Sequence, residues 1–160
     1  MPIERYSVGF SRVAPVAPGE AYAELLAGAA DPVSVKSITV TTGSNIGGHI
    51  GLVRSHAIGT AAATGIYTGI AHRTQATAAT GIARAHVAWT SSGVTPTGGI
   101  ARLKDELLPV ATGQTRTIWD CDRDGELLIE PTKSVLLVNV GSGIDGGGAR
   151  FNITWAEGRL

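Results

Sequence analysis

The residues with the clearest potential for chemistry are Asp120-Cys121-Asp122-Arg123-Asp124-Gly125, which match the Asp-x-Asp-x-Asp-Gly opening of a calcium-binding loop. An EF-hand loop that starts at Asp120 needs a bidentate acid at its twelfth position, but that position is Pro131, and Glu130 comes one residue early. Asp and Gly are also the residues that hairpin turns favour, and the flanking TRTIW and ELLIE have the composition of strands. We therefore predict a hairpin turn that needs no calcium. Weak calcium binding by Asp120, Asp122 and Asp124 is the alternative.

A second motif is the glycine-rich run GSGIDGGG, which satisfies Gly-x-Gly-x-x-Gly through Gly141, Gly143 and Gly146. A dinucleotide site requires a helix to begin at such a run, because the helix N-terminus presents its amides to the pyrophosphate. The segment that follows, GARFNITW, has the alternation of a strand instead. We predict a hairpin loop and no cofactor.

The remaining reactive side chains do not form a catalytic or metal-binding pattern. No two of the four histidines have the short spacing that would place both imidazoles on one strand face or one helical turn. Their positions are His49, His56, His72 and His86. The chain lacks a Gly-x-Ser-x-Gly nucleophile motif, and its single cysteine, Cys121, excludes an intramolecular disulfide and a multi-cysteine zinc site. We predict no catalytic, cofactor-binding or metal-binding residues, and a protein that is not an enzyme.

The elements that position these residues are expected to be short strands. In ARFNITW, at residues 149–155, apolar and polar residues alternate, as in a strand with one buried face. SVLLVNVG, at residues 134–141, is apolar on both faces and predicts a central strand. In PVSVKSITVTTG the apolar phase shifts between Val35 and Ile38, which indicates a β-bulge. Five further segments have a strand pattern and bring the total to about eight: RYSVGF, HIGLVRS, RAHVAWT, TRTIWD and GELLIE.

These strands predict an all-β fold, an antiparallel β-sandwich of the jelly-roll type, in one domain over residues 1–160. GEAYAELLAGA has the propensity for a short helix of about two turns. Trp89, Trp119 and Trp155 alternate with polar neighbours, so we expect them in the core.

Residues 57–99 form a long Ala/Thr/Gly-rich insertion, in which AATGI occurs at residues 62–66 and again at 78–82. Large apolar side chains are scarce there, so the segment has little surface to bury by itself. We expect it to lie at an interface, ordered by a neighbouring subunit or shell, with Tyr67 as its anchor.

Charge is balanced overall but is not uniform along the chain. Residues 32–104 contain six Lys and Arg residues and no Asp or Glu, whereas both flanks are acidic. These charges either balance within one chain or meet across subunits. The basic residues are widely spaced without interleaved aromatics, so we predict no nucleic-acid partner. The N-terminus has no secretion signal and no segment approaches membrane-spanning length, so we expect synthesis in the cytoplasm and no membrane partner.

The part of the chain that begins at Leu107 resembles the C-terminal half of small β-sandwich virion proteins of tailed bacteriophages. The segments that carry this resemblance are LLPVATGQTRTIWDCDRDGELLIEPTKSVLLVNVGSG and, after it, FNITWAE. AYAEL, GLVRSHAIGT and AHVAWT fit the same outline. The resemblance implies a head decoration or cement protein located in the virion. Its implied partners are the major capsid protein and copies of itself, often as trimers. The alternative is a tail- or fibre-associated module that binds glycan on the host surface.

Overall fold

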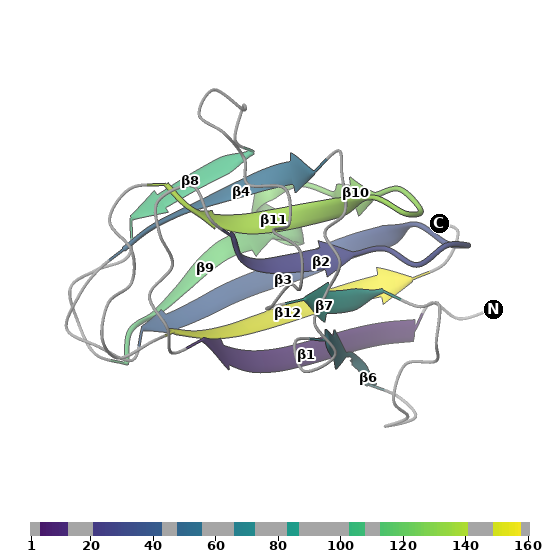
Figure 1. The fold of residues 1–160 in the computed structure, drawn as a ribbon, viewed down its shortest axis with the longest axis horizontal. Coiled ribbons are helices and arrows are strands. Elements are labelled where there is room, and N and C mark those ends of the chain that lie inside the picture. Colours follow the sequence, from purple (N-terminus) through teal and green to yellow (C-terminus); the bar gives the residue numbers. More distant parts are fainter. Residues whose placement is uncertain are drawn as a thin grey trace.

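The computed structural model describes most of the strands expected from the sequence (Figure 1). The described residues are 4–12, 21–42, 48–55, 66–72, 83–86, 103–107, 113–140 and 149–157. They form two antiparallel sheets and one helical turn, so the predicted antiparallel β-sandwich is confirmed. No helix in this part of the chain has the length and apolar character of a membrane span.

Sheet A contains the first and last strands. Its members are β1 (Glu4–Arg12), β3 (Val33–Thr42), β6 (Ile70–Ala71), β9 (Thr115–Asp120), β10 (Leu127–Ile129) and β12 (Ala149–Glu157). β12 lies between β1 and β3, β6 pairs with the outer edge of β1, and both β9 and β10 pair with β3.

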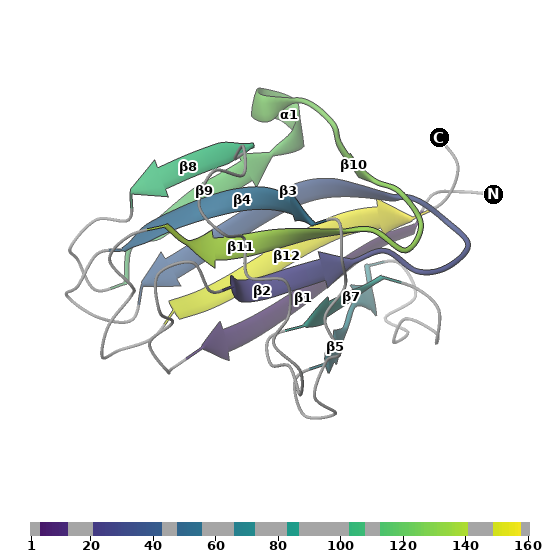
Figure 2. The ribbon, with the colours of Figure 1, turned by 45° about the horizontal axis from the view of Figure 1, so that its top comes forward.

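Sheet B is arranged around the apolar strand β11. Its members are β2 (Ala21–Leu26), β4 (His49–Ser55), β5 (Ile66–Thr68), β7 (Arg84–His86), β8 (Lys104–Leu107) and β11 (Ser134–Asn139). Their order is β5-β7-β2-β11-β4-β8. Figure 2 shows the two sheets as stacked layers, with β2, β11 and β4 in front of β1, β12 and β3.

The strand order is that of a jelly roll, as the sequence predicted. The first strand pairs with the last, β1 with β12, and the second pairs with the one before the last, β2 with β11. β3 then lies beside β12 and β4 beside β11, while β8 closes sheet B and β9 and β10 close sheet A. The short strands β5, β6 and β7 come from the insertion and extend the opposite edges of the two sheets.

The space between the sheets is filled by apolar side chains from both of them, which form one buried cluster. Phe151 is central to it, with ring centroids 5.3 Å from Phe10 and 5.8 Å from Tyr22. Trp155 is fully buried and Trp119 is 8% exposed, so the prediction of core tryptophans is confirmed for both. Trp89 lies outside the described residues.

Two finer predictions about the strands are also confirmed. Ser37 pairs with Thr154 and Val35 with Trp155, so Lys36 is the extra residue of a β-bulge at the place where the apolar phase shifts. β11 is central, because it pairs with β2 on one side and β4 on the other, and all six of its residues are buried.

The helix expected within GEAYAELLAGA is wrong, because residues 21–26 form strand β2. Helix propensity is a weak preference that tertiary contacts override. Here β11 and β7 supply backbone partners on both sides of β2, and Tyr22, Ala23 and Leu25 enter the core.

The described parts of the insertion pack against this chain's own sandwich. β5 and β7 join sheet B, β6 joins sheet A, and the backbone amide of Ala83 donates to the Glu157 carboxylate at 2.9 Å. Tyr67, expected to anchor the insertion to a partner, contacts Phe10 of the same core, with ring centroids 5.6 Å apart. The order of these residues therefore needs no second subunit, and a contact of the insertion with one stays a prediction.

Candidate functional site

The Asp-rich motif forms a single helical turn, α1 (Cys121–Asp124), between β9 and β10. Asp120 is its N-cap, since its side-chain Oδ1 accepts a hydrogen bond from the Asp122 amide at 3.0 Å. Gly125 ends the turn with a φ of 87°, a conformation that glycine adopts without the strain of a Cβ atom.

The predicted hairpin at this motif is wrong. β9 pairs with residues 37–41 of β3 and β10 with residues 33–35, both in antiparallel register. β9 and β10 therefore run in the same direction along one edge of β3, and α1 interrupts that edge. The Asp and Gly preferences of a hairpin turn and of a capped helical turn overlap, so composition alone did not separate them.

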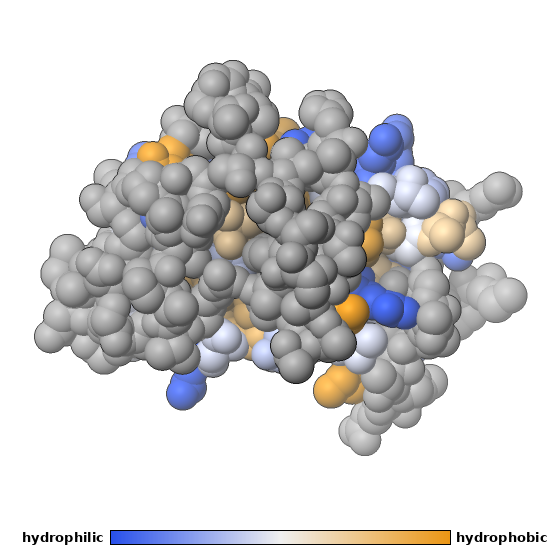
Figure 3. All heavy atoms as spheres, viewed as in Figure 1, coloured by the Kyte–Doolittle hydropathy of each residue, from blue (hydrophilic) through white to orange (hydrophobic). Residues whose placement is uncertain are grey.

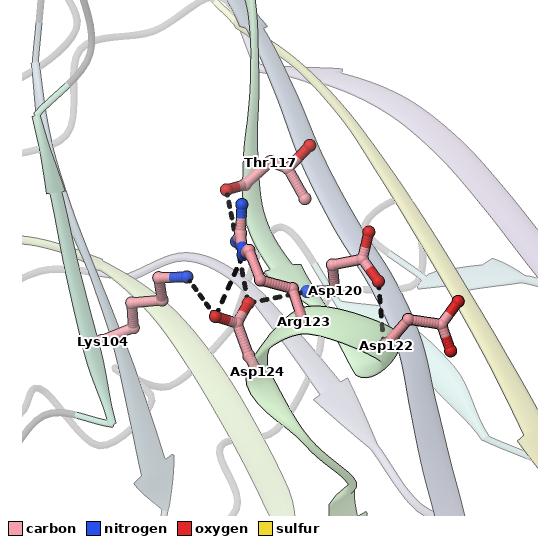
Figure 4. Close-up of polar contacts among 6 residues, drawn as sticks. All are labelled: Lys104, Thr117, Asp120, Asp122, Arg123 and Asp124. Atoms are coloured by element: carbon pink, nitrogen blue, oxygen red, sulfur yellow. Dashed lines mark hydrogen bonds and ion pairs between the residues drawn. The ribbon is translucent and has the colours of Figure 1, made fainter.

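The carboxylate of Asp124 is the centre of a polar cluster (Figure 4). It accepts hydrogen bonds from Lys104 Nζ at 2.8 Å, from Arg123 Nη2 at 2.8 Å and Nε at 3.1 Å, and from the Asp120 amide at 2.9 Å. Hydrogen bonds from Arg123 and Lys104 hold the pKa of Asp124 well below its usual range. Because Lys104 lies on β8 of sheet B, this cluster ties the edges of the two sheets together.

The carboxylates of Asp120 and Asp124 bind groups of the protein itself. Asp124 faces two cationic side chains, and one oxygen of Asp120 caps α1. Within the described ranges, no group of three His, Cys, Asp or Glu side chains is placed to hold a metal ion. That the segment needs no calcium stays a prediction.

The other residues considered from the sequence lie apart from one another. His49 begins β4, His72 follows β6, and His86 ends β7. His56 lies outside the described residues, and so does the glycine run at 141–148. The hairpin predicted for that run is wrong, because the run connects β11 of sheet B to β12 of sheet A, and these two strands do not pair with each other. Cys121 is a free, half-buried cysteine in α1.

A half-buried carboxylate lies near the end of β12. The Oε1 atom of Glu157 accepts from Trp155 Nε1 at 2.8 Å and from the Ala83 amide at 2.9 Å. Glu4 of β1 pairs with Glu157 in the strand register. Burial, with a smaller contribution from Asp31, raises the pKa of Glu157.

The feature that sequence reasoning missed is the outer face of sheet A. Residues that alternate with the core positions of β1, β12, β3 and β9 lie side by side there, according to the strand register. We call this surface the hydroxyl face; its members are Ser7, Gly9, Ser11, Ser37, Thr39, Thr41, Thr115, Thr117, Asn152 and Thr154. All of them are exposed or half-buried.

Charged residues border the hydroxyl face at two diagonally opposite corners, and the exposed Arg5 of β1, which pairs with Ala156, lies beyond Ser7. Arg150, paired with Thr41, is exposed at one end. Asp120, paired with Ser37, lies at the other end, next to the exposed Asp122 of α1. Figure 4 shows the Asp122 side chain on the opposite side of α1 from Lys104.

At the corner of sheet A around Ser34, side chains of the protein cover the outer face. Lys36 Nζ donates to Ser34 Oγ at 2.8 Å, and Ser34 Oγ donates to Glu126 Oε1 at 2.9 Å. Ser34 and Ala156 are buried beside these contacts. The accessible part of the face therefore begins at the pair Ser37 and Thr154.

The exposed large apolar side chains of the described residues are spread over different elements. Ile70 lies on β6, Leu103 precedes β8, and Leu128 lies on β10. The view in Figure 3 likewise shows apolar described residues scattered among polar ones. Single exposed apolar side chains are normal on soluble domains and define no site.

Comparisons with known proteins add no assignment to this geometry. No family model matches the chain, and no curated protein or solved structure shows significant similarity to it. The function must therefore be argued from the fold, the core and the surface.

Proposed function

We propose that this chain is a non-enzymatic structural protein of a tailed-phage virion, a decoration or cement protein that binds the assembled head. The observation that carries this proposal is the filled interior of the jelly roll. Jelly rolls serve as viral capsid domains, as lectin domains and as cupins. In this chain, large side chains of both sheets meet between the layers, so what the fold presents to other molecules is its outer surface.

The proposed partners are the major capsid protein and copies of the chain itself, as the sequence resemblance implies. In this proposal the protein is made in the cytoplasm of the bacterial host and acts as part of the virion.

The alternative, a glycan-binding tail module, receives less support from the aromatic side chains. Trp155 and Trp119 pack in the core and Tyr22 is fully buried, so these rings are not presented to a ligand. The hydroxyl face itself contains no aromatic residue. The hydroxyl face therefore has no aromatic ring on which a sugar could stack.

The test is made on purified particles of the phage that encodes the chain. Mass spectrometry of the particles, after separation of heads from tails, should find the chain in the head fraction at a fixed ratio to the major capsid protein. Recombinant chain added to heads that lack it should bind and raise the temperature at which they release DNA. Absence from the particles would refute the proposal, and presence in the tail fraction alone would favour the alternative.

A further inference from the structure

The hydroxyl face has a charge pattern that is complementary to itself. Asp120 pairs with Ser37 from one side of β3, and Arg150 pairs with Thr41 from the other side. Thr39 lies midway between Ser37 and Thr41 on the same strand. From strand and residue spacing, the two charged positions are roughly 10 Å apart across the strands and roughly 13 Å apart along them. The acidic corner and the basic corner are therefore symmetric about Thr39.

We propose that two copies of this chain associate through their hydroxyl faces, related by a two-fold axis that lies in the contact plane and passes over Thr39. This rotation places Arg150 of each copy against the Asp120 and Asp122 corner of the other. A two-fold contact uses the same patch on both subunits, so one surface with opposite charges at opposite corners satisfies it. The partner is a second copy, because the face supplies both members of each contact.

The charged side chains at these corners are available for such a contact. Within the described part of the chain, the Arg150 guanidinium and the Asp122 carboxylate form no hydrogen bond or ion pair, in contrast to the Asp124 carboxylate. Asp120 uses one oxygen for its N-cap hydrogen bond. The charges that stabilise the sandwich are thus different from those that face outward.

The residues between the corners suit close contact between two sheets. Threonine side chains have restricted χ1 rotamers, so ordering them on contact loses little entropy. Thr41 Oγ1 and Thr115 Oγ1 already share a hydrogen bond of 2.7 Å, which fixes one cross-strand pair before association. The uncharged centre also brings no like charges together at the axis.

The size of the face indicates a weak contact. Four strands at about 4.8 Å spacing and about 20 Å of strand length give roughly 400 Å² of flat area per copy. Two copies then bury on the order of 800 Å² in total, below the size of stable specific interfaces. We expect a dimer that forms at high concentration and weakens as salt screens the charges. Copies held side by side on a shell would meet at high effective concentration.

The experiment is sedimentation equilibrium of the full chain over a wide concentration range, at low and high salt. Arg150→Glu and Asp122→Arg should each weaken dimerisation about tenfold or more, because each brings like charges together. The double variant should restore the dissociation constant to within a few-fold of the original. Lys133→Glu, an exposed charge reversal in the turn before β11, is the matched control and should change nothing.

Thermal unfolding of each variant shows whether the fold is kept, and both substituted side chains are exposed, so we expect it to be. Thr39→Lys provides an independent probe, because it places two cations at the proposed axis and should abolish the dimer. A chain that is monomeric at every concentration would overturn the inference. So would an oligomer that the single variants leave unchanged, or a double variant that fails to restore it. The inference does not rest on binding to a phage head, so the two proposals can fail separately.

Discussion

Gly69 is the point where the insertion meets the core, and its replacement by alanine tests that contact. It lies between β5 and β6, against the edge of the buried Trp155 ring. A Cβ atom at this position would be 2.5 Å from Cη2 and 2.6 Å from Cζ2 of Trp155, and 3.0 Å from Cβ of Tyr6. Carbon atoms in good contact are about 3.5 to 4.0 Å apart, so the ring or the backbone must move by about 1 Å.

The indole ring has little freedom to make that movement. Trp155 is fully buried, donates its Nε1 hydrogen to Glu157 at 2.8 Å, and stacks on Tyr6 with ring centroids 6.0 Å apart. Overpacking of a filled core typically costs about 1 to 3 kcal/mol. With an unfolding entropy proportional to the 160 residues of the chain, that loss lowers Tm by roughly 3 to 9 °C.

Calorimetry at fixed pH and protein concentration measures this shift, and tryptophan fluorescence reports on the ring itself. Gly9→Ala is the matched control, because Gly9 also lies in sheet A but faces solvent. A Cβ atom there would meet only the Phe151 carbonyl oxygen, at 3.9 Å. Its Tm should stay the same or rise slightly, since glycine weakens the interior of a strand.

Equal Tm values for Gly69→Ala and Gly9→Ala would refute the reasoning. That result would mean that the segment around Gly69 does not rest on Trp155 in the free chain. The insertion would then need a neighbouring subunit for its order, as the sequence first suggested. A lower Tm for Gly69→Ala alone assigns the segment to its own sandwich.

Two further predictions concern carboxylates with shifted pKa values. Because burial raises the pKa of Glu157, the stability of the protein should fall as pH rises from the unfolded value near 4.5 through the folded value. Glu157→Gln keeps an acceptor for Trp155 and Ala83, so this variant should lose that fall in thermal unfolding measured across pH. Because hydrogen bonds from Arg123 and Lys104 lower the pKa of Asp124, its contribution to the free energy of unfolding is present above pH 4 and is lost on acidification. Asp124→Asn should therefore lower the free energy of unfolding by about 1 kcal/mol in urea at pH 7. No difference between variant and original at pH 7 would contradict the role of the cluster.

The strands with the strongest alternation were predictable because burial on one face leaves a period of two in the sequence. ARFNITW became β12 with its apolar residues buried, and the phase shift in PVSVKSITVTTG marked the bulge at Lys36. The fully apolar SVLLVNVG became the central strand β11. In these segments the local pattern and the tertiary environment agree.

Prediction failed where the local pattern is compatible with two structures. AYAELL has helix propensity, but as β2 it lies between β7 and β11, and nothing local reveals those neighbours. Likewise, the sequence around Asp120 favours a turn without showing that β9 and β10 share one edge of β3. Long-range pairing decided both cases.

The hydroxyl face shows the same limit at the level of function. Its elements were visible in the sequence as polar positions of the alternating strands, such as Thr39 and Thr41, or Asn152 and Thr154. What was not visible is that β1, β12, β3 and β9 are neighbours and that their polar positions fall in register. A surface of this kind is a property of the pairing, so only the fold reveals it.

The acidic motif resolves into two separate roles once the fold is known. Asp124 is occupied by Lys104 of the opposite sheet and by Arg123, so it stabilises the sandwich. Asp122, one half-turn away in α1, is exposed on the other side and left for a partner. Replacing Asp124 should therefore lower stability, whereas replacing Asp122 should change association and leave stability unchanged. Because the two carboxylates share one helical turn, a different outcome for each would show that the side on which a residue projects, rather than its place in the motif, determines what it does.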